Sequence, residues 1–154
     1  MNKARLLITI ILAAAGIFLT IGDTHLPAAK GIDYDGFSAT RASKDIEIIS
    51  SEPHSIYHPQ ERAKVKEYLA SRFEDLGVYY EIFDYDSLMD RKGYVFNISN
   101  IYSVTEPVNK KANSYVLLIA HYDSSPAKEI KGEKVVSYGA ADDGYGLATI
   151  LELL

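Results

Sequence analysis

A run of apolar residues, Val116 to Ala120, limits the possible folds of this chain more than any other segment. A strand without polar alternation is typical of the centre of a sheet that is covered on both faces. His121 ends the run, a connection follows from Tyr122 to Gly139, and apolar residues recur at helical spacing from Gly144 onwards. A buried strand followed by an amphipathic helix predicts an α/β fold in which helices flank a central sheet.

The residues upstream of this strand predict two helices and a hairpin. Apolar residues at spacings of three and four predict a helix within Phe37 to Ser50, with Ser38 as its N-cap. A second helix is predicted from Pro59 to Leu76, because proline favours the first helical position and Gly77 follows the end. The aromatic segment VYYEIFDY and a second segment, Tyr94 to Val104, are typical of strands. The short polar link between them favours an antiparallel hairpin.

The N-terminus carries an uncharged apolar segment, Leu6 to Gly22, which follows Lys3 and Arg5. Such a segment is directed to a membrane, and we expect a retained signal anchor with the later residues on the extracytoplasmic side. A cleaved signal peptide and a buried helix of a soluble protein are the alternatives. We therefore divide the chain into the anchor or signal peptide at 1–22, a linker at 23–36 and one domain portion at 37–154.

Composition excludes several classes of function. The net charge is −5, and an acidic protein repels phosphate backbones, so no nucleic-acid partner is expected. The chain has no cysteine, which excludes disulfides, thiolate catalysis and cysteine-ligated metal sites. Any bound metal must therefore use His, Asp or Glu side chains.

Two polar motifs flank the long connection after the predicted central strand. His121 and Asp123 end the strand and point the same way, while Asp142 and Asp143 follow the small residues of Gly139-Ala140-Ala141. Each motif has a structural explanation, a histidine bonded to a nearby carboxylate or acidic residues at a helix N-terminus. Together, at adjacent strand-to-helix connections, they provide nitrogen and oxygen ligands for a cation such as Zn²⁺.

These motifs resemble a known family. SYVLLIAHYDSSP and SYGAADDGYGLATILELL look like the co-catalytic zinc exopeptidases, which include leucyl-type aminopeptidases, glutaminyl cyclases and membrane-bound metallopeptidases of the endoplasmic reticulum and vacuole. The upstream segment 37–77 resembles the start of the membrane-bound branch. The resemblance implies a three-layer fold with a mixed central sheet and flanking helices, here truncated and preceded by a membrane helix.

The resemblance also implies roles for individual residues. His121 would bind one zinc ion, Asp142 would bridge two zinc ions, and Asp123 would orient His121. Asp143 would have a backbone role, because the family commonly has a cis peptide after the bridging aspartate. No site role is expected for His54 or His58, which would be loop histidines at the surface or packed against an aromatic ring.

The implied reaction is hydrolysis of the N-terminal peptide bond of a peptide with a free N-terminus, by a water that two zinc ions activate. The family's glutamate base and remaining ligands would lie beyond Leu154, so we expect a fragment that is inactive alone and binds zinc weakly. Two alternatives remain open: a glutaminyl-cyclase-like acyltransferase with a single zinc, and a non-catalytic ectodomain of the same fold. The oligomeric state does not follow from the sequence.

Overall fold

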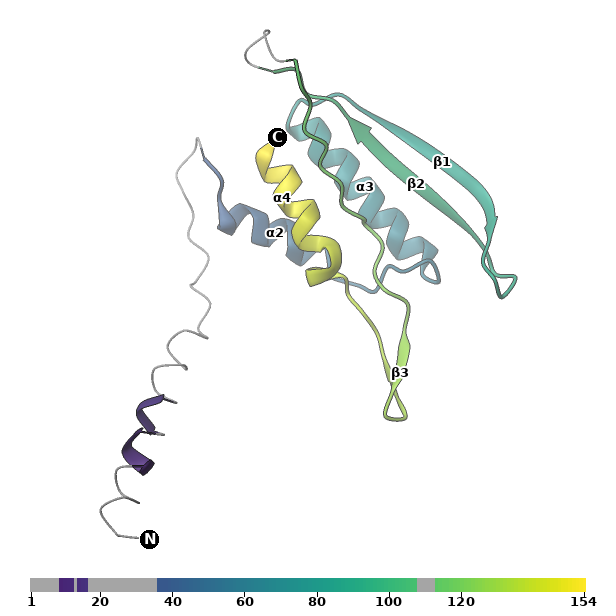
Figure 1. The fold of residues 1–154 in the computed structure, drawn as a ribbon. Coiled ribbons are helices and arrows are strands. Elements are labelled where there is room, and N and C mark those ends of the chain that lie inside the picture. The colour runs from purple at the N-terminus through teal and green to yellow at the C-terminus, as the bar shows by residue number, and fades with distance from the viewer. Residues whose placement is uncertain (1–8, 13, 17–35, 108–112) are drawn as a thin grey trace.

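A computed structural model describes residues 9–12, 14–16, 36–107 and 113–154. Its main elements are, in order, helices α2 (Ala39–Ile49) and α3 (Pro59–Asp75), strands β1 (Tyr80–Met89) and β2 (Val95–Ser103), strands β3 (Lys128–Ile130) and β4 (Glu133–Val135), a π-helical turn (Ala140–Gly144) and helix α4 (Tyr145–Leu153). Helix α2 packs against α4, and α3 lies against β2 (Figure 1). The described strands form two separate antiparallel pairs, β1 with β2 and β3 with β4.

The three predicted helices are confirmed, and local signals set their ends. The Ser38 hydroxyl accepts a hydrogen bond from the Arg41 amide at 3.3 Å and so caps α2. Pro59 is the first residue of α3, which ends before Gly77 with φ +67°. Glycine adopts this left-handed conformation without steric cost, which turns the chain from α3 towards β1.

The predicted hairpin is also confirmed. Strands β1 and β2 pair antiparallel from Tyr80 opposite Ser103 to Met89 opposite Val95, with an irregularity between Tyr85 and Leu88. Gly93, with φ +80°, lies in the turn that joins them. A short link with a glycine at a positive φ is typical of such a turn.

The core joins all three helices. Ile49 of α2, Val65 and Leu69 of α3, and Leu151 of α4 are buried together. Tyr122, which lies beside His121 in sequence, packs against this cluster. The core therefore contacts both the segment that carries His121 and the helix that follows Asp142.

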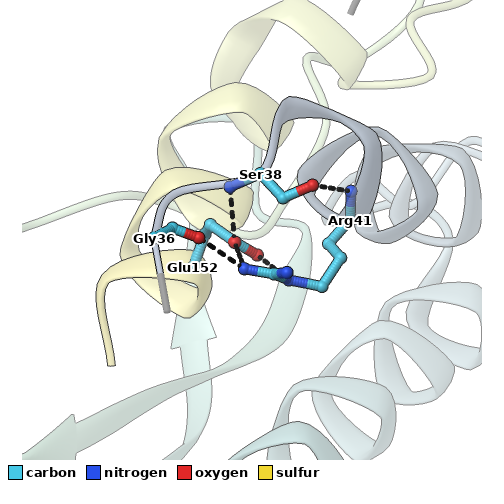
Figure 2. Close-up of polar contacts among 4 residues, drawn as sticks. All are labelled: Gly36, Ser38, Arg41 and Glu152. Atoms are coloured by element: carbon cyan, nitrogen blue, oxygen red, sulfur yellow. Dashed lines mark hydrogen bonds and ion pairs between the residues drawn. The ribbon is translucent and has the colours of Figure 1, made fainter. Parts of the chain in front are cut away.

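A polar contact adds to the packing of α2 on α4. Figure 2 shows the carboxylate of Glu152 between Ser38 and Arg41, at the start of α2. Glu152 accepts a hydrogen bond from the Ser38 amide at 2.7 Å and pairs with the Arg41 guanidinium, which also donates to the Gly36 carbonyl at 2.7 Å. The Glu152 side chain is 3% exposed, whereas the Arg41 side chain is 46% exposed, so this contact is buried on the Glu152 side only.

The predicted central strand at 114–121 is wrong for this structure. The segment forms no strand, and Val116, Leu117 and Ile119 are 87%, 75% and 81% exposed. A strand that is buried on both faces needs hydrogen-bonding neighbours at both edges and a covering layer on each side. The described residues provide neither for this segment, so the mixed central sheet is also absent from this part of the chain.

The connection from Tyr122 to Gly139 contains a hairpin of β3 and β4, which the sequence did not predict. Lys131 and Gly132 lie in its turn with φ +53° and +83°. The hairpin projects away from the helices (Figure 1). Its sequence lacks the regular alternation of apolar and polar residues that identifies longer strands.

The predicted membrane segment and linker lie mostly outside the described residues. Two short stretches of the segment, 9–12 and 14–16, are helical and exposed. Within the described parts of the chain, no helix has both the length and the apolar character needed to cross a membrane.

Candidate metal centre

The structure brings together His121 and Asp142 from opposite ends of the long connection. The imidazole Nε2 of His121 lies 3.0 Å from Oδ1 of Asp142. Both side chains reach solvent, with 50% and 78% of their surfaces exposed. A shallow hollow is lined by these two residues together with Asp123, Ser124 and Ser125. A nitrogen donor and a carboxylate donor therefore converge where a small ligand has access.

Asp123 holds the other side of the imidazole ring. The Nδ1 of His121 donates to the Asp123 backbone carbonyl at 2.9 Å, and the Asp123 carboxylate oxygen Oδ1 lies 3.4 Å from the same nitrogen. A bond at Nδ1 fixes the orientation of the ring and leaves Nε2 directed at Asp142. Asp123 therefore contacts the Nδ1 of His121 through both its main-chain carbonyl and its side-chain carboxylate.

The surroundings of His121 favour its protonated form. Partial burial lowers the pKa of the imidazole, but the bonds to the Asp142 carboxylate and the Asp123 carbonyl outweigh that effect, so the pKa lies above its ordinary value. Both ring nitrogens face oxygen acceptors, and both can donate only in the imidazolium. A cation between Nε2 and Asp142 would replace one of these protons.

A tight turn places Asp142 at the start of α4. Gly139 begins the turn with φ +72°, and its carbonyl accepts a hydrogen bond from the Gly144 amide at 2.8 Å. The peptide bond between Asp142 and Asp143 is cis. The two neighbouring carboxylates have separate surroundings, with Asp142 at His121 and Asp143 at the helix.

Asp143 caps α4 and does not contact His121. Its Oδ1 accepts a hydrogen bond from the Gly146 amide at 3.1 Å. A Cβ atom built at Gly146 would lie 2.4 Å from that same oxygen, which is closer than real Cβ atoms come to their neighbours. The glycine in the Gly144-Tyr145-Gly146 segment thus allows the aspartate to cap the helix.

His54 is a residue near the site that the sequence analysis missed. It is 1% exposed, so it does not lie at the surface, which was one of the two positions expected for it. Its amide donates to Ser124 Oγ at 3.0 Å, and its ring lies against Gly139. His58 instead precedes α3 and bonds to the Ser55 hydroxyl at 2.9 Å through Nδ1.

The donor set fits part of a zinc site. One imidazole nitrogen and one carboxylate oxygen face each other, and both are common zinc ligands. No group of three or more His, Asp or Glu side chains suited to a metal occurs among the residues that the structure describes. Zinc takes three or four protein ligands, so His121 and Asp142 would provide two of them.

Comparisons of the sequence with known proteins find similar peptidases. The model of peptidase family M28 matches residues 100–154, which contain both motifs. The vacuolar membrane proteases of Vanderwaltozyma polyspora and Pyrenophora teres f. teres are each 29% identical over alignments that cover 90% of this chain. The chain spans 16% of the length of each of these relatives.

A solved structure shares the fold. The leucine aminopeptidase precursor from Bacteroides thetaiotaomicron aligns with 79% of this chain and 42% of its own chain, with a TM-score of 0.64 and 22% identity. This neighbour has an aminopeptidase fold of mixed helices and strands. The sequence and structure matches together confirm the resemblance to the zinc exopeptidases.

Proposed function

We propose that this chain, as a relative of the zinc exopeptidases, supplies part of the catalytic centre of a zinc-dependent aminopeptidase. The observation that carries the proposal is the 3.0 Å approach of His121 Nε2 to Asp142 Oδ1 from two segments that are far apart in the chain. The family match over both motifs supports the same assignment.

The residues of this chain have distinct parts in the proposed centre. His121 and Asp142 would hold zinc, with Asp142 bridging two ions, and Asp123 would keep Nε2 of the imidazole directed at the metal. When bound, zinc would supply a Lewis acid that polarises a carbonyl group and activates water. Asp143 would hold the Asp142 turn at the start of α4 through its bond to Gly146.

The remaining ligands and a base are proposed to come from residues outside the present sequence. Two protein ligands are fewer than zinc normally takes. The curated relatives are about six times as long as the aligned part of this chain, which leaves ample sequence for these groups. We therefore expect the 154-residue chain alone to bind zinc weakly and to lack peptidase activity.

The proposed substrate is a peptide with a free N-terminus, and the proposed location is a membrane. The relatives are named vacuolar membrane proteases, which supports association with a membrane. Residues 6–22 are the proposed anchor, which would leave the peptidase domain on the extracytoplasmic side. A cleaved signal peptide would instead release the domain.

The test is the activity of the complete protein on aminoacyl substrates, with metal content measured in the same samples. Asp142→Asn should lower both zinc content and hydrolysis, because the amide oxygen is a weaker ligand than a carboxylate. Asp86→Asn is a matched control, since Asp86 is an exposed carboxylate on β1, away from His121. Unchanged zinc content and activity in Asp142→Asn would contradict the proposal.

The same assay separates the alternative functions. A glutaminyl-cyclase-like enzyme would release ammonia from peptides with N-terminal glutamine and would leave other N-terminal peptide bonds intact. A non-catalytic ectodomain would do neither and would contain no zinc. Hydrolysis of several N-terminal peptide bonds by the zinc-loaded protein is the outcome that the proposal requires.

A further inference from the structure

We propose that His54 is a positioning residue that sets the separation between the two segments of the metal centre. This inference rests on the proposed function, because it concerns the same His121 and Asp142. His54 lies in the loop between α2 and α3, and it touches both segments without reaching the hollow between them.

One side of His54 holds the segment that carries His121. The His54 amide donates to Ser124 Oγ at 3.0 Å, and the Ser124 amide approaches the His54 carbonyl at 3.4 Å. Both residues are 1% exposed, so water does not compete for these bonds. Because Ser124 directly follows Asp123, the pair of bonds fixes the chain that orients His121.

The other side of His54 supports the turn that carries Asp142. A Cβ atom built at Gly139 would lie 3.1 Å from both Nε2 and Cε1 of the His54 ring, and 3.2 Å from the Ser124 Cβ. The ring, Ser124 and the glycine are therefore in contact with no spare space. Gly139 in turn accepts the hydrogen bond from Gly144 that closes the turn.

The ring itself is fixed in place. Nδ1 of His54 lies 2.8 Å from the Glu52 carbonyl, to which it donates as the Nδ1-protonated tautomer. The edge with Nε2 then faces Gly139. A rigid planar ring held at one edge by its own loop acts as a spacer between Ser124 and Gly139. Removal of the spacer should let the two ligand segments move relative to each other.

The experiment measures zinc affinity and the absorption spectrum of the cobalt-substituted form in the complete protein. His54→Leu removes the Nδ1 donor and the planar ring, and we expect an affinity loss of about 10- to 100-fold, as for other residues that orient metal ligands. The cobalt spectrum should change, because it reports the geometry of the ligands. His54→Asn keeps a side-chain N–H near the Glu52 carbonyl but lacks the ring that lies against Gly139, so it should recover little of the affinity.

His58→Asn is the matched control. His58 lies in the same loop and also makes one side-chain bond, but it contacts neither Ser124 nor Gly139 among the interactions of the described residues. Asparagine is a good residue at this N-cap position of α3, so the helix should be retained. An equal loss of zinc affinity in His58→Asn would overturn the positioning role, because it would show a general effect of the loop.

Ser124→Ala tests the positioning role of His54 if His54→Leu does not fold. This variant removes only the acceptor of the His54 amide and should lower zinc affinity with a change in the cobalt spectrum. Wild-type affinity and spectrum in Ser124→Ala, or in a folded His54→Leu, would overturn the proposal. Absence of zinc binding by the wild-type protein would instead contradict the proposed function itself.

Discussion

The carboxylate of Glu152, near the end of α4, accepts a hydrogen bond from the amide of Ser38 at the start of α2, at 2.7 Å. The same carboxylate pairs with Arg41 (Figure 2). This contact joins residues that are 114 positions apart in the sequence. It holds the first helix of the domain on the helix that follows the Asp142 turn.

Glu152→Gln should therefore destabilise the protein. The substitution keeps the shape of the side chain but removes the charge that faces Arg41. Because Arg41 is half-exposed, we expect a loss of about 1 kcal/mol, the low end of the range for bonds to charged groups. Chemical denaturation should give a reduced free energy of unfolding. The control is Glu52→Gln. The ion pair of Glu52 with Lys64 is largely exposed, so this substitution should change the free energy of unfolding little. Equal stability of the two variants would show that the Glu152 contact is not formed.

Gly146→Ala should disturb the start of α4. The added Cβ would lie 2.4 Å from Asp143 Oδ1, so the carboxylate must leave its cap position. We expect a net loss of stability of no more than about 1 kcal/mol, because the lost hydrogen bond costs about 0.5 to 1.5 kcal/mol and alanine is favoured over glycine in a helix. In the background of Asp143→Ala the same glycine substitution should cost much less. Additive effects of the two substitutions in thermal denaturation would contradict this explanation.

Zinc affinity should weaken as pH falls. The weakening should occur at higher pH values than for a zinc ligand histidine with an ordinary pKa. The bonds to Asp142 and Asp123 raise the pKa of His121 in the metal-free protein, and the protonated imidazole cannot bind a metal. The affinity should be fully present above this raised pKa and should be lost as pH falls through it. Calorimetric titrations in two buffers of different ionisation enthalpy should detect the released proton.

A control for the proton release is His121→Asn. This variant lacks the titrating imidazole, so any residual zinc binding should release fewer protons in the same calorimetric titrations. An unchanged number of released protons would show that another residue, and not His121, loses the proton when zinc binds.

The parts of the fold that the sequence predicted correctly depend on local signals. Ser38, Pro59 and Gly77 mark helix ends through their own hydrogen bonds or backbone preferences, and the structure has helix ends at these positions. The β1–β2 hairpin likewise pairs two segments that are adjacent in the chain. Such features need little information from distant residues.

The prediction for 114–121 failed because a central strand depends on distant partners. Its apolar residues indicate burial, but burial and strand pairing require neighbours that the described residues do not provide. His54 was missed for a related reason. Its burial comes from Ser124, which lies 70 positions later, and no pattern within the loop indicates that contact. Gly139, which Ala140 and Ala141 follow, was a local sign of a close approach.

The roles of His121 and Asp142 as zinc ligands are the central claim. The direct measurement is anomalous diffraction at the zinc edge from crystals of the complete protein. We predict a zinc peak about 2.0 to 2.2 Å from both His121 Nε2 and an Asp142 carboxylate oxygen, with the His121 ring still bonded to Asp123. A zinc peak that lies beyond bonding distance of either residue would contradict the account.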